Sequence, residues 1–143
     1  MIRLDPYESL GLYCTLTRKA FLAGLEKKLK GTGVSPTQFI ALVQLVGLGS
    51  ITQSKLAVIL LVKPPTAVQL VNRMERNGWV TRQTDSKDGR VKRLVPTKKA
   101  IEIFGKVSHV GRELMDEAYW GIHPSEIETV KRVLDRVRKN LGA

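Results

Sequence analysis

The feature that most constrains the fold is a double proline, Pro64-Pro65, between two short stretches with apolar residues at helical spacing. Each proline lacks a backbone N–H and pushes the residue before it out of the helical region, so no single helix runs through this point. Proline is nevertheless well suited to the first turn of a new helix. The sequence therefore predicts one helix from a Thr52 cap to near Leu61 and a second helix that starts at about Pro65.

The second predicted helix has two chemically distinct faces. The apolar residues recur at helical spacing and predict a buried side formed by Ala67, Leu70, Val71 and Met74. The opposite side carries hydroxyl, amide and guanidinium groups, from Thr66, Gln69, Arg73 and Arg76. These groups can hydrogen-bond base edges or phosphates, but a solvated polar face is the ordinary alternative for this helix taken alone.

The next segment has the pattern of a β-hairpin. Asn77-Gly78 is expected to end the helix, with the glycine in the left-handed conformation. The stretches Trp79–Thr81 and Arg90–Val95 suit strands, and Asp88-Gly89 between them is typical of a two-residue turn. From Lys87 to Lys99, the hairpin and its exit carry one acid, Asp88, against the cations Lys87, Arg90, Lys92, Arg93, Lys98 and Lys99. An arm with this charge fits the minor groove of DNA, whose negative potential favours arginine.

The overall charge also indicates a polyanionic partner. The chain of 143 residues has 24 Lys and Arg against 13 Asp and Glu, a net charge of +11. The cations are spread over several helices and a hairpin, which favours nucleic acid over a membrane surface. Two short helices followed by a basic hairpin predict a winged helix-turn-helix that reads double-stranded DNA. We expect the groove to be contacted by Lys63, Pro65, Thr66 and Gln69, the DNA backbone by Arg73 and Arg76, and the minor groove by Arg90 and Lys92 of the wing.

These motifs resemble the MarR family of bacterial transcription regulators, and within it the SlyA-like branch. The family's wing signature, Asp-x-Arg-x-x-Arg, is matched by Asp88, Arg90 and Arg93. The family's Leu-Ala pair, in the helix that begins after Thr52, is Leu56-Ala57. Its glycine-initiated motif, after the helix that begins at about Pro65, is Gly78-Trp79-Val80-Thr81-Arg82. The resemblance implies a dimer in which Arg90 enters the minor groove while Asp88 and Arg93 hold the wing in shape.

The chain departs from this family pattern at three positions. Gly89 stands where a second wing arginine is frequent, and Leu61 where a small or polar turn residue is usual. Gln69 stands where the SlyA-like branch tends to have arginine. Because an amide prefers adenine and a guanidinium prefers guanine, the branch's operator sequence does not carry over to this chain.

The two ends of the chain predict long helices with exposed apolar stripes. One helix is expected from about Asp5 to Lys30. Asp5 would be its N-cap, Pro6 would stand in its first turn, and Glu8 would complete a capping box with Asp5. A last helix from about Pro124, with Ser125 and Glu128 as its cap, carries a regular apolar seam of Ile127, Val130, Leu134, Val137 and Leu141. Packing within one subunit is the alternative, but a seam of this kind favours a partner helix.

The predicted architecture is mainly α with a small β-hairpin wing, in the α+β class. Residues 1–34 and 97–143 form a helical dimerisation region, and residues 35–96 form the winged helix-turn-helix. The function expected is a homodimeric regulator, a repressor by family resemblance, on an inverted-repeat operator. The alternative from another class is a DNA-coating protein with little sequence preference, because charge alone fits both.

The family resemblance also implies an effector. Small aromatic carboxylates or phenols bind many MarR relatives between the dimer layer and the DNA-binding part, which points to Arg18, Thr37 and Phe39 here. A surface charge at Arg18 and a plain core role for Phe39 are equally compatible with the sequence. One branch senses hydroperoxides through a cysteine in the first helix, and Cys14 lies in that helix, although a free cysteine is commonly a small buried hydrophobe.

Other function classes find little support in the sequence. The two histidines, His109 and His123, have no cysteine or acid at a ligand or triad spacing, so we expect neither an enzyme nor a metal or cofactor site. The calcium-loop pattern of Asp85 to Gly89 lacks the acids that calcium needs. No run of eighteen apolar residues occurs, and the first residues lack the apolar centre of a signal peptide, which predicts a cytoplasmic protein without a membrane span.

Overall fold

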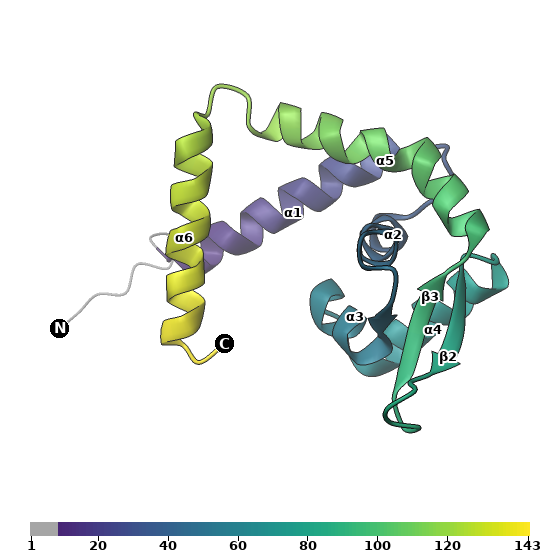
Figure 1. Ribbon diagram of the computed structural model, residues 1–143. Helices are drawn as coiled ribbons and strands as arrows, with labels where there is room; N and C mark the ends of the chain where they lie inside the picture. Colours follow the sequence, from purple (N-terminus) through teal and green to yellow (C-terminus); the bar gives the residue numbers. More distant parts are fainter. Residues whose placement is uncertain (1–8) are drawn as a thin grey trace.

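The computed structural model describes residues 9–143, which form six helices and one small sheet (Figure 1). In chain order the elements are α1 (Leu10–Leu29), α2 (Pro36–Leu48), β1 (Ile51–Thr52), α3 (Gln53–Leu60), α4 (Pro64–Arg76), β2 (Val80–Thr84), β3 (Lys92–Pro96), α5 (Lys98–Ala118) and α6 (Pro124–Asn140). This confirms the predicted class, mainly α with a small β wing. The predicted roles of Asp5, Pro6 and Glu8 in opening the first helix lie outside the described residues.

One hydrophobic core joins α2, α3, α4 and the sheet, and the end of α1 and the first half of α5 complete it. The helix α4 contributes the four side chains that the sequence predicted for its buried face, Ala67, Leu70, Val71 and Met74. Burying a large apolar side chain stabilises the fold by about 1.5–3 kcal/mol, so this stripe fixes the helix against the core. The polar face of α4 is consequently turned outward.

The turn between α3 and α4 forms where the prolines require it. Leu60 is the last residue of α3, and Leu61 adopts the left-handed conformation with φ of 54°. Lys63 then precedes α4, which begins with Pro64 and Pro65 in its first turn. Within residues 9–143 no single helix is long and apolar enough to cross a membrane, and α3 and α4 reach that length only together, with a bend of 109° between them.

The sheet contains a strand that the sequence did not reveal. Its order is β1-β3-β2, with both pairs antiparallel, and β1 pairs Ile51 with Leu94. A two-residue strand is too short to show an alternating pattern, so only its pairing with β3 defines it. Buried Ile51 and Leu94 anchor the wing to the core through this pairing.

The predicted two-residue hairpin turn at Asp88-Gly89 is wrong. The ladder ends at the pair Thr84 and Lys92, so residues 85–91 form a longer loop. Arg90, expected in a strand, lies in this loop. Backbone bonds close this loop, from the Asp85 N–H to the Val91 carbonyl and from the Val91 N–H to the Asp88 carbonyl, both at 3.0 Å. Two aspartate side chains add to them: Asp85 accepts the backbone N–H of Asp88 at 3.3 Å, and Asp88 accepts that of Arg90 at 3.0 Å.

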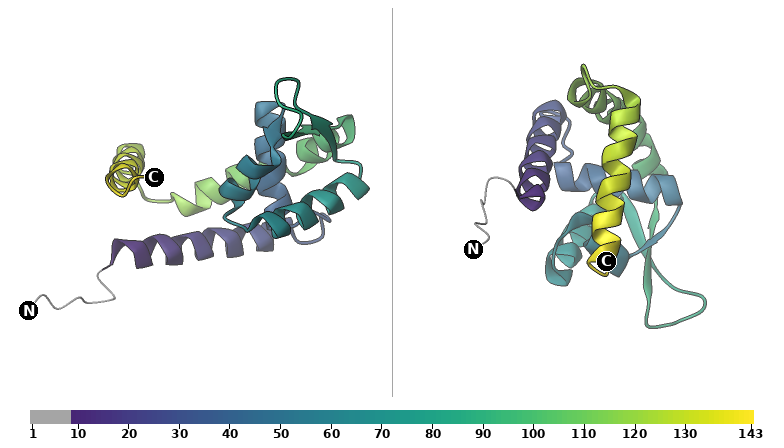
Figure 2. Two further views of the ribbon diagram at one scale, coloured as in Figure 1. Left: turned by 90° about the horizontal axis from the view of Figure 1, so that it is seen from below. Right: turned by 90° about the vertical axis from the view of Figure 1, so that its left-hand side faces the viewer.

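The helices α1, α5 and α6 form a second part of the molecule. Helices α1 and α5 run side by side, and Gly24 leaves room for the Leu114 side chain, because a Cβ at Gly24 would lie 2.8 Å from Leu114 Cδ1. Lys28 donates to Glu117 at 2.7 Å across the same pair, which raises the pKa of Lys28 and lowers the pKa of Glu117. Helix α6 stands apart from the part formed by α2, α3, α4 and the sheet (Figures 1 and 2), and none of its residues is buried.

The cap of α6 differs from the predicted one. The sequence suggested Ser125 with Glu128, but His123 is the N-cap and Glu126 completes the capping box. The His123 ring accepts the Ser125 backbone N–H at 3.2 Å, and the Glu126 carboxylate accepts the His123 backbone N–H at 2.9 Å. Histidine is an uncommon cap, so the Ser-x-x-Glu pattern two residues later was the misleading signal.

Candidate nucleic-acid interface

The polar face of α4 is exposed along its whole length. The structure leaves exposed all the residues that the sequence assigned to DNA around this helix, namely Lys63, Pro65, Thr66, Gln69, Arg73 and Arg76. A helix of 13 residues is about 20 Å long, which suits a major groove. Thr66 and Gln69 lie near its N-terminal end, the end from which recognition helices reach base edges.

The wing loop presents Arg90 to the solvent. Its side chain is 94% exposed and contacts only its neighbour Asp88, whose carboxylate lies 3.4 Å from Arg90 Nε. The same carboxylate accepts the Arg90 backbone N–H, so Asp88 shapes the loop from which the guanidinium projects. Lys92, also exposed, donates to Thr84 Oγ1 at 3.2 Å across the hairpin.

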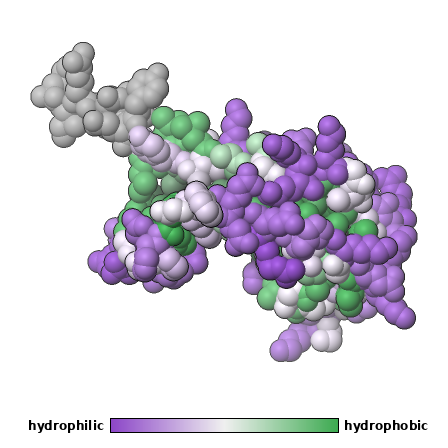
Figure 3. All heavy atoms as spheres, turned by 90° about the horizontal axis from the view of Figure 1, so that it is seen from above, coloured by the Kyte–Doolittle hydropathy of each residue, from purple (hydrophilic) through white to green (hydrophobic). Residues whose placement is uncertain are grey.

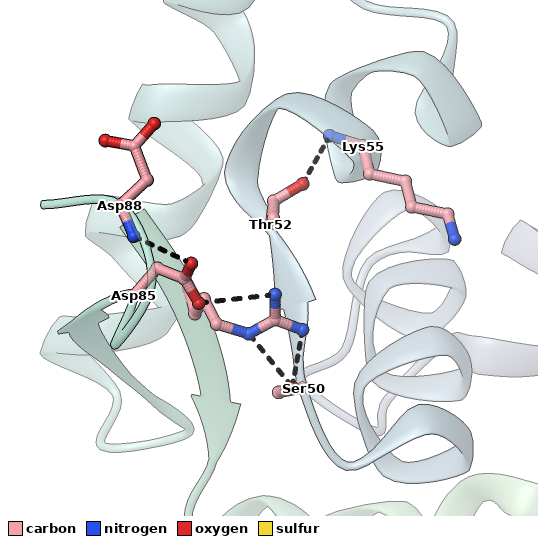
Figure 4. A network of polar contacts seen from close by, with 6 residues as sticks. Ser50, Thr52, Lys55, Asp85 and Asp88 are labelled. Atoms are coloured by element: carbon pink, nitrogen blue, oxygen red, sulfur yellow. Dashed lines mark hydrogen bonds and ion pairs between the residues drawn. The ribbon is translucent and has the colours of Figure 1, made fainter. Parts of the chain in front are cut away.

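The base of the wing is held by a polar network around Arg93 and Asp85 (Figure 4). The Arg93 guanidinium donates to Ser50 Oγ at 2.9 and 3.3 Å and lies 3.9 Å from the Asp85 carboxylate. The sequence grouped Asp88 with Arg93 as wing support, whereas the structure places them in separate contacts. Asp85 connects the two, because its carboxylate also accepts the Asp88 backbone N–H.

Sequence reasoning did not include Asp85 or Ser50 in the site. The available signal was Asp85-Ser86-Lys87-Asp88, because an aspartate frequently accepts a backbone N–H two or three residues later in a turn. Ser50 gave no such signal, since 43 residues separate it from Arg93 and only the fold brings them together.

Replacing Asp85 with alanine should loosen the wing. The change removes the acceptor of the Asp88 N–H and the partner of Arg93, so we expect the free energy of unfolding to fall by about 0.5–1.5 kcal/mol. Amide exchange at Asp88 should accelerate, as measured by NMR. Ser86→Ala in the same loop is the control, and equal protection of the Asp88 amide in both variants would rule out this role for Asp85.

A wide cavity of about 920 Å³ lies between α1, α2 and the α3–α4 turn. Arg18 of α1 and Thr37 of α2, two of the three predicted effector residues, line it together with Ile40 and Leu61. Phe39, the third, does not line it: this side chain is buried in the core, and its ring centre lies 6.4 Å from that of Phe104. Cys14 is exposed on α1 and its redox role stays a prediction.

A second cavity, of about 580 Å³, opens between α1, α5 and α6. Its lining is mainly apolar and includes Phe21, Leu114, Ile127, Val130 and Leu134. Within residues 9–143 no cluster of three or more His, Cys, Asp or Glu side chains is arranged to hold a metal ion.

Comparison with known proteins finds a family model that matches part of this architecture. Residues 32–91, from the turn before α2 to the wing loop, match the family model described as MarR family. The match covers most of the winged helix-turn-helix part and supports the family that the sequence motifs suggested.

Individual known proteins are also similar to this chain in sequence or in fold. Over 114 residues, 80% of this chain and 76% of the relative, the sequence is 28% identical to the uncharacterized HTH-type transcriptional regulator YybA of Bacillus subtilis (strain 168). The crystal structure of NadR in complex with 4-hydroxyphenylacetate is similar at a TM-score of 0.83 and 19% identity, covering 97% of this chain and 99% of NadR. A mutant MarR from E. coli, solved with operator DNA, is similar at a TM-score of 0.78 and 22% sequence identity. The match covers 94% of this chain and 99% of the MarR chain. At these identities the solved structures establish the fold.

Proposed function

We propose that this chain is a MarR-type regulator that acts in the cytoplasm as a homodimer, binds an inverted-repeat operator and represses transcription until a small aromatic carboxylate or phenol binds it. The observation that carries the proposal is the exposed polar face of α4 beside the exposed Arg90 of the wing. The SlyA-like branch belongs to the same proposal; the wing signature of Asp88, Arg90 and Arg93 supports the family as a whole, and Gln69 departs from the pattern of that branch.

Two elements, α4 and the wing loop, form the DNA-binding surface. Thr66 and Gln69 on α4 present a hydroxyl and an amide that can read base edges in the major groove, while Arg73 and Arg76 pair with phosphates. Arg90 extends from the loop into the neighbouring minor groove. The similarity of fold to E. coli MarR, whose mutant was solved with operator DNA, supports this mode of docking.

The homodimer is supported by apolar surface that one chain leaves uncovered. On α6 the seam residues Val130 and Leu141 are exposed, and the exposed apolar residues Leu10, Tyr13 and Leu16 of α1 lie on the same projecting part of the molecule. Figure 3 shows hydrophobic side chains at the surface there. A second copy that inserts apolar side chains between α1 and α6 would remove this surface from water. Two α4 helices related by a twofold axis then require an inverted repeat.

The effector is expected in the 920 Å³ cavity. Arg18 supplies a guanidinium for a carboxylate, Thr37 a hydroxyl, and Ile40 and Leu61 an apolar surface for an aromatic ring. Leu61 belongs to the α3–α4 turn, so an occupant of this cavity touches the DNA-reading helices directly. The structural similarity to NadR, solved with 4-hydroxyphenylacetate, supports this ligand class.

The effector site is tested with 4-hydroxyphenylacetate as the probe. Isothermal titration should detect binding to the parent protein, and Arg18→Ala should weaken that binding by about 10- to 100-fold, because a charge-assisted hydrogen bond contributes about 1.5–3 kcal/mol. Lys27→Ala is the matched control, since it removes the same charge from α1 outside this cavity. Equal affinities of the Arg18 and Lys27 variants would contradict the assignment of Arg18.

The DNA function itself is tested by selection from random duplexes at physiological salt. A sequence-specific regulator should enrich one inverted repeat and bind it about a thousandfold or more tightly than unrelated DNA. A DNA-coating protein would bind both with similar affinity. A ratio near one would therefore replace the proposed function with that alternative.

A further inference from the structure

Arg82 of β2 makes three side-chain hydrogen bonds with residues on two other elements. Its Nε donates to Gln53 Oε1 at 3.2 Å, its Nη1 to Glu75 Oε2 at 3.2 Å, and its Nη2 to Asn72 Oδ1 at 2.7 Å. The Arg82 side chain is only 24% exposed. Each of its three nitrogens thus has a partner, and three of its five N–H donors are engaged in contacts within the chain.

The three partners belong to the parts that must act together on DNA. Gln53 is the first residue of α3, Asn72 and Glu75 lie one turn apart on α4, and Arg82 lies in the strand that leads into the wing loop. A guanidinium is planar and presents its donors in fixed directions, so three simultaneous bonds restrict the angle between β2 and α4. A lysine at this position has neither the planar geometry nor the spread of donors.

Glu75, one of the three partners of Arg82, is far from any other acid in the sequence. Between residues 35 and 84 it is the only acid in the sequence. Its carboxylate is 46% exposed, on the same helix as Arg73 and Arg76, so unpaired it would repel DNA phosphates. Because a partly exposed ion pair adds little to stability, the main effects of the pair are on geometry and local charge.

We infer that Arg82 is a positioning residue for sequence reading: it fixes the wing strand relative to the recognition helix α4, and it neutralises Glu75 beside the DNA. This inference rests on the proposed DNA-binding function. Its consequence is that the preference for the operator over other DNA depends on a residue that contacts no base. The variants that separate geometry from charge are Arg82→Gln, Glu75→Gln and the double variant.

The experiment measures dissociation constants for the duplex selected by the parent protein and for an unrelated duplex. Arg82→Gln should weaken operator binding by about 10- to 100-fold over the two subunits, and unrelated DNA by only a few-fold through the uncovered Glu75 charge. The double variant restores the net charge, so its affinity for unrelated DNA should return to the parent level. Its affinity for the operator should remain at least about tenfold below the parent's.

Three results would overturn the inference. Full recovery of operator binding in the double variant would mean that Arg82 acts by charge alone. A persistent, equal loss on both duplexes would mean that Arg82 contacts phosphates. An unchanged ratio of the two affinities in Arg82→Gln would remove the positioning role. If the parent itself showed no preference, the proposed function would fail first, independently of Arg82.

Two controls keep the test interpretable. Lys106→Gln, on the exposed side of α5, removes one positive charge away from the DNA surface and should leave the ratio of affinities unchanged. Asn72→Ala removes one acceptor without altering charge and should lower the ratio in the same direction as Arg82→Gln. If Arg82→Gln does not fold stably, Asn72→Ala replaces it as the test variant. An unchanged ratio of operator affinity to unrelated-DNA affinity in Asn72→Ala would then contradict the inference.

Discussion

Replacing Arg90 with alanine should weaken operator binding by about 100-fold or more, because each of two wings loses a contact of about 1–3 kcal/mol. The folded chain should be almost unaffected, since the Arg90 side chain is 94% exposed and contacts only Asp88. Fluorescence anisotropy on the selected duplex measures the loss. The slope of the logarithm of affinity against the logarithm of salt should also decrease, because fewer counterions are released.

The matched control is Lys106→Ala, which removes the same charge from the exposed side of α5. It should reduce affinity only through the net charge and should spare the preference between duplexes. Equal losses of operator affinity in Arg90→Ala and Lys106→Ala would mean that Arg90 contributes to DNA binding only through the net charge. A drop in melting temperature in Arg90→Ala alone would point instead to a structural contact that the described residues do not contain.

Replacing Val130 with aspartate should separate the subunits and abolish operator binding at nanomolar protein concentrations. Val130 is 54% exposed in the single chain, so the chain can still fold, while a dimer would bury the new carboxylate in an apolar seam. Burying an unpaired charge costs several kcal/mol at each of two symmetry-related positions. Sedimentation velocity should show a monomer, and half an inverted repeat should be bound only weakly.

Asn140→Asp is the control for this experiment. It adds the same negative charge to α6 on the face that also carries Arg136 and Lys139, away from the apolar seam. This variant should remain dimeric and bind the operator. A dimeric Val130→Asp protein with full operator affinity would refute the proposed interface, and a monomeric parent protein would refute the dimer itself.

The exposed residues of the candidate site could be predicted from the sequence, but some of their hydrogen-bond partners could not. The outward residues of α4 could be predicted because a helix has a fixed period, so the buried stripe of Ala67, Leu70, Val71 and Met74 determines which residues face away from it. The exposed Arg90 followed from a basic hairpin with a family signature. The partners of Arg93 and Arg82 could not be predicted in the same way, because Ser50 and Gln53 lie 43 and 29 residues away along the chain.

Local chemistry was therefore determined by the sequence itself. The proline pair ended one helix and opened the next, Thr52 capped α3 by accepting the Lys55 N–H, and Gly78 took the left-handed conformation after α4. These features depend on backbone sterics and on hydrogen bonds between near neighbours, which do not require the rest of the fold.

Only the tertiary structure decided the features that depend on contacts between distant segments. The strand β1 exists because β3 pairs with it. The wing loop is held by backbone bonds together with the side chains of Asp85 and Asp88, and Phe39 packs near Phe104 instead of lining the cavity beside Arg18. In each case several local arrangements have similar free energies, and packing against residues far along the chain selects one of them.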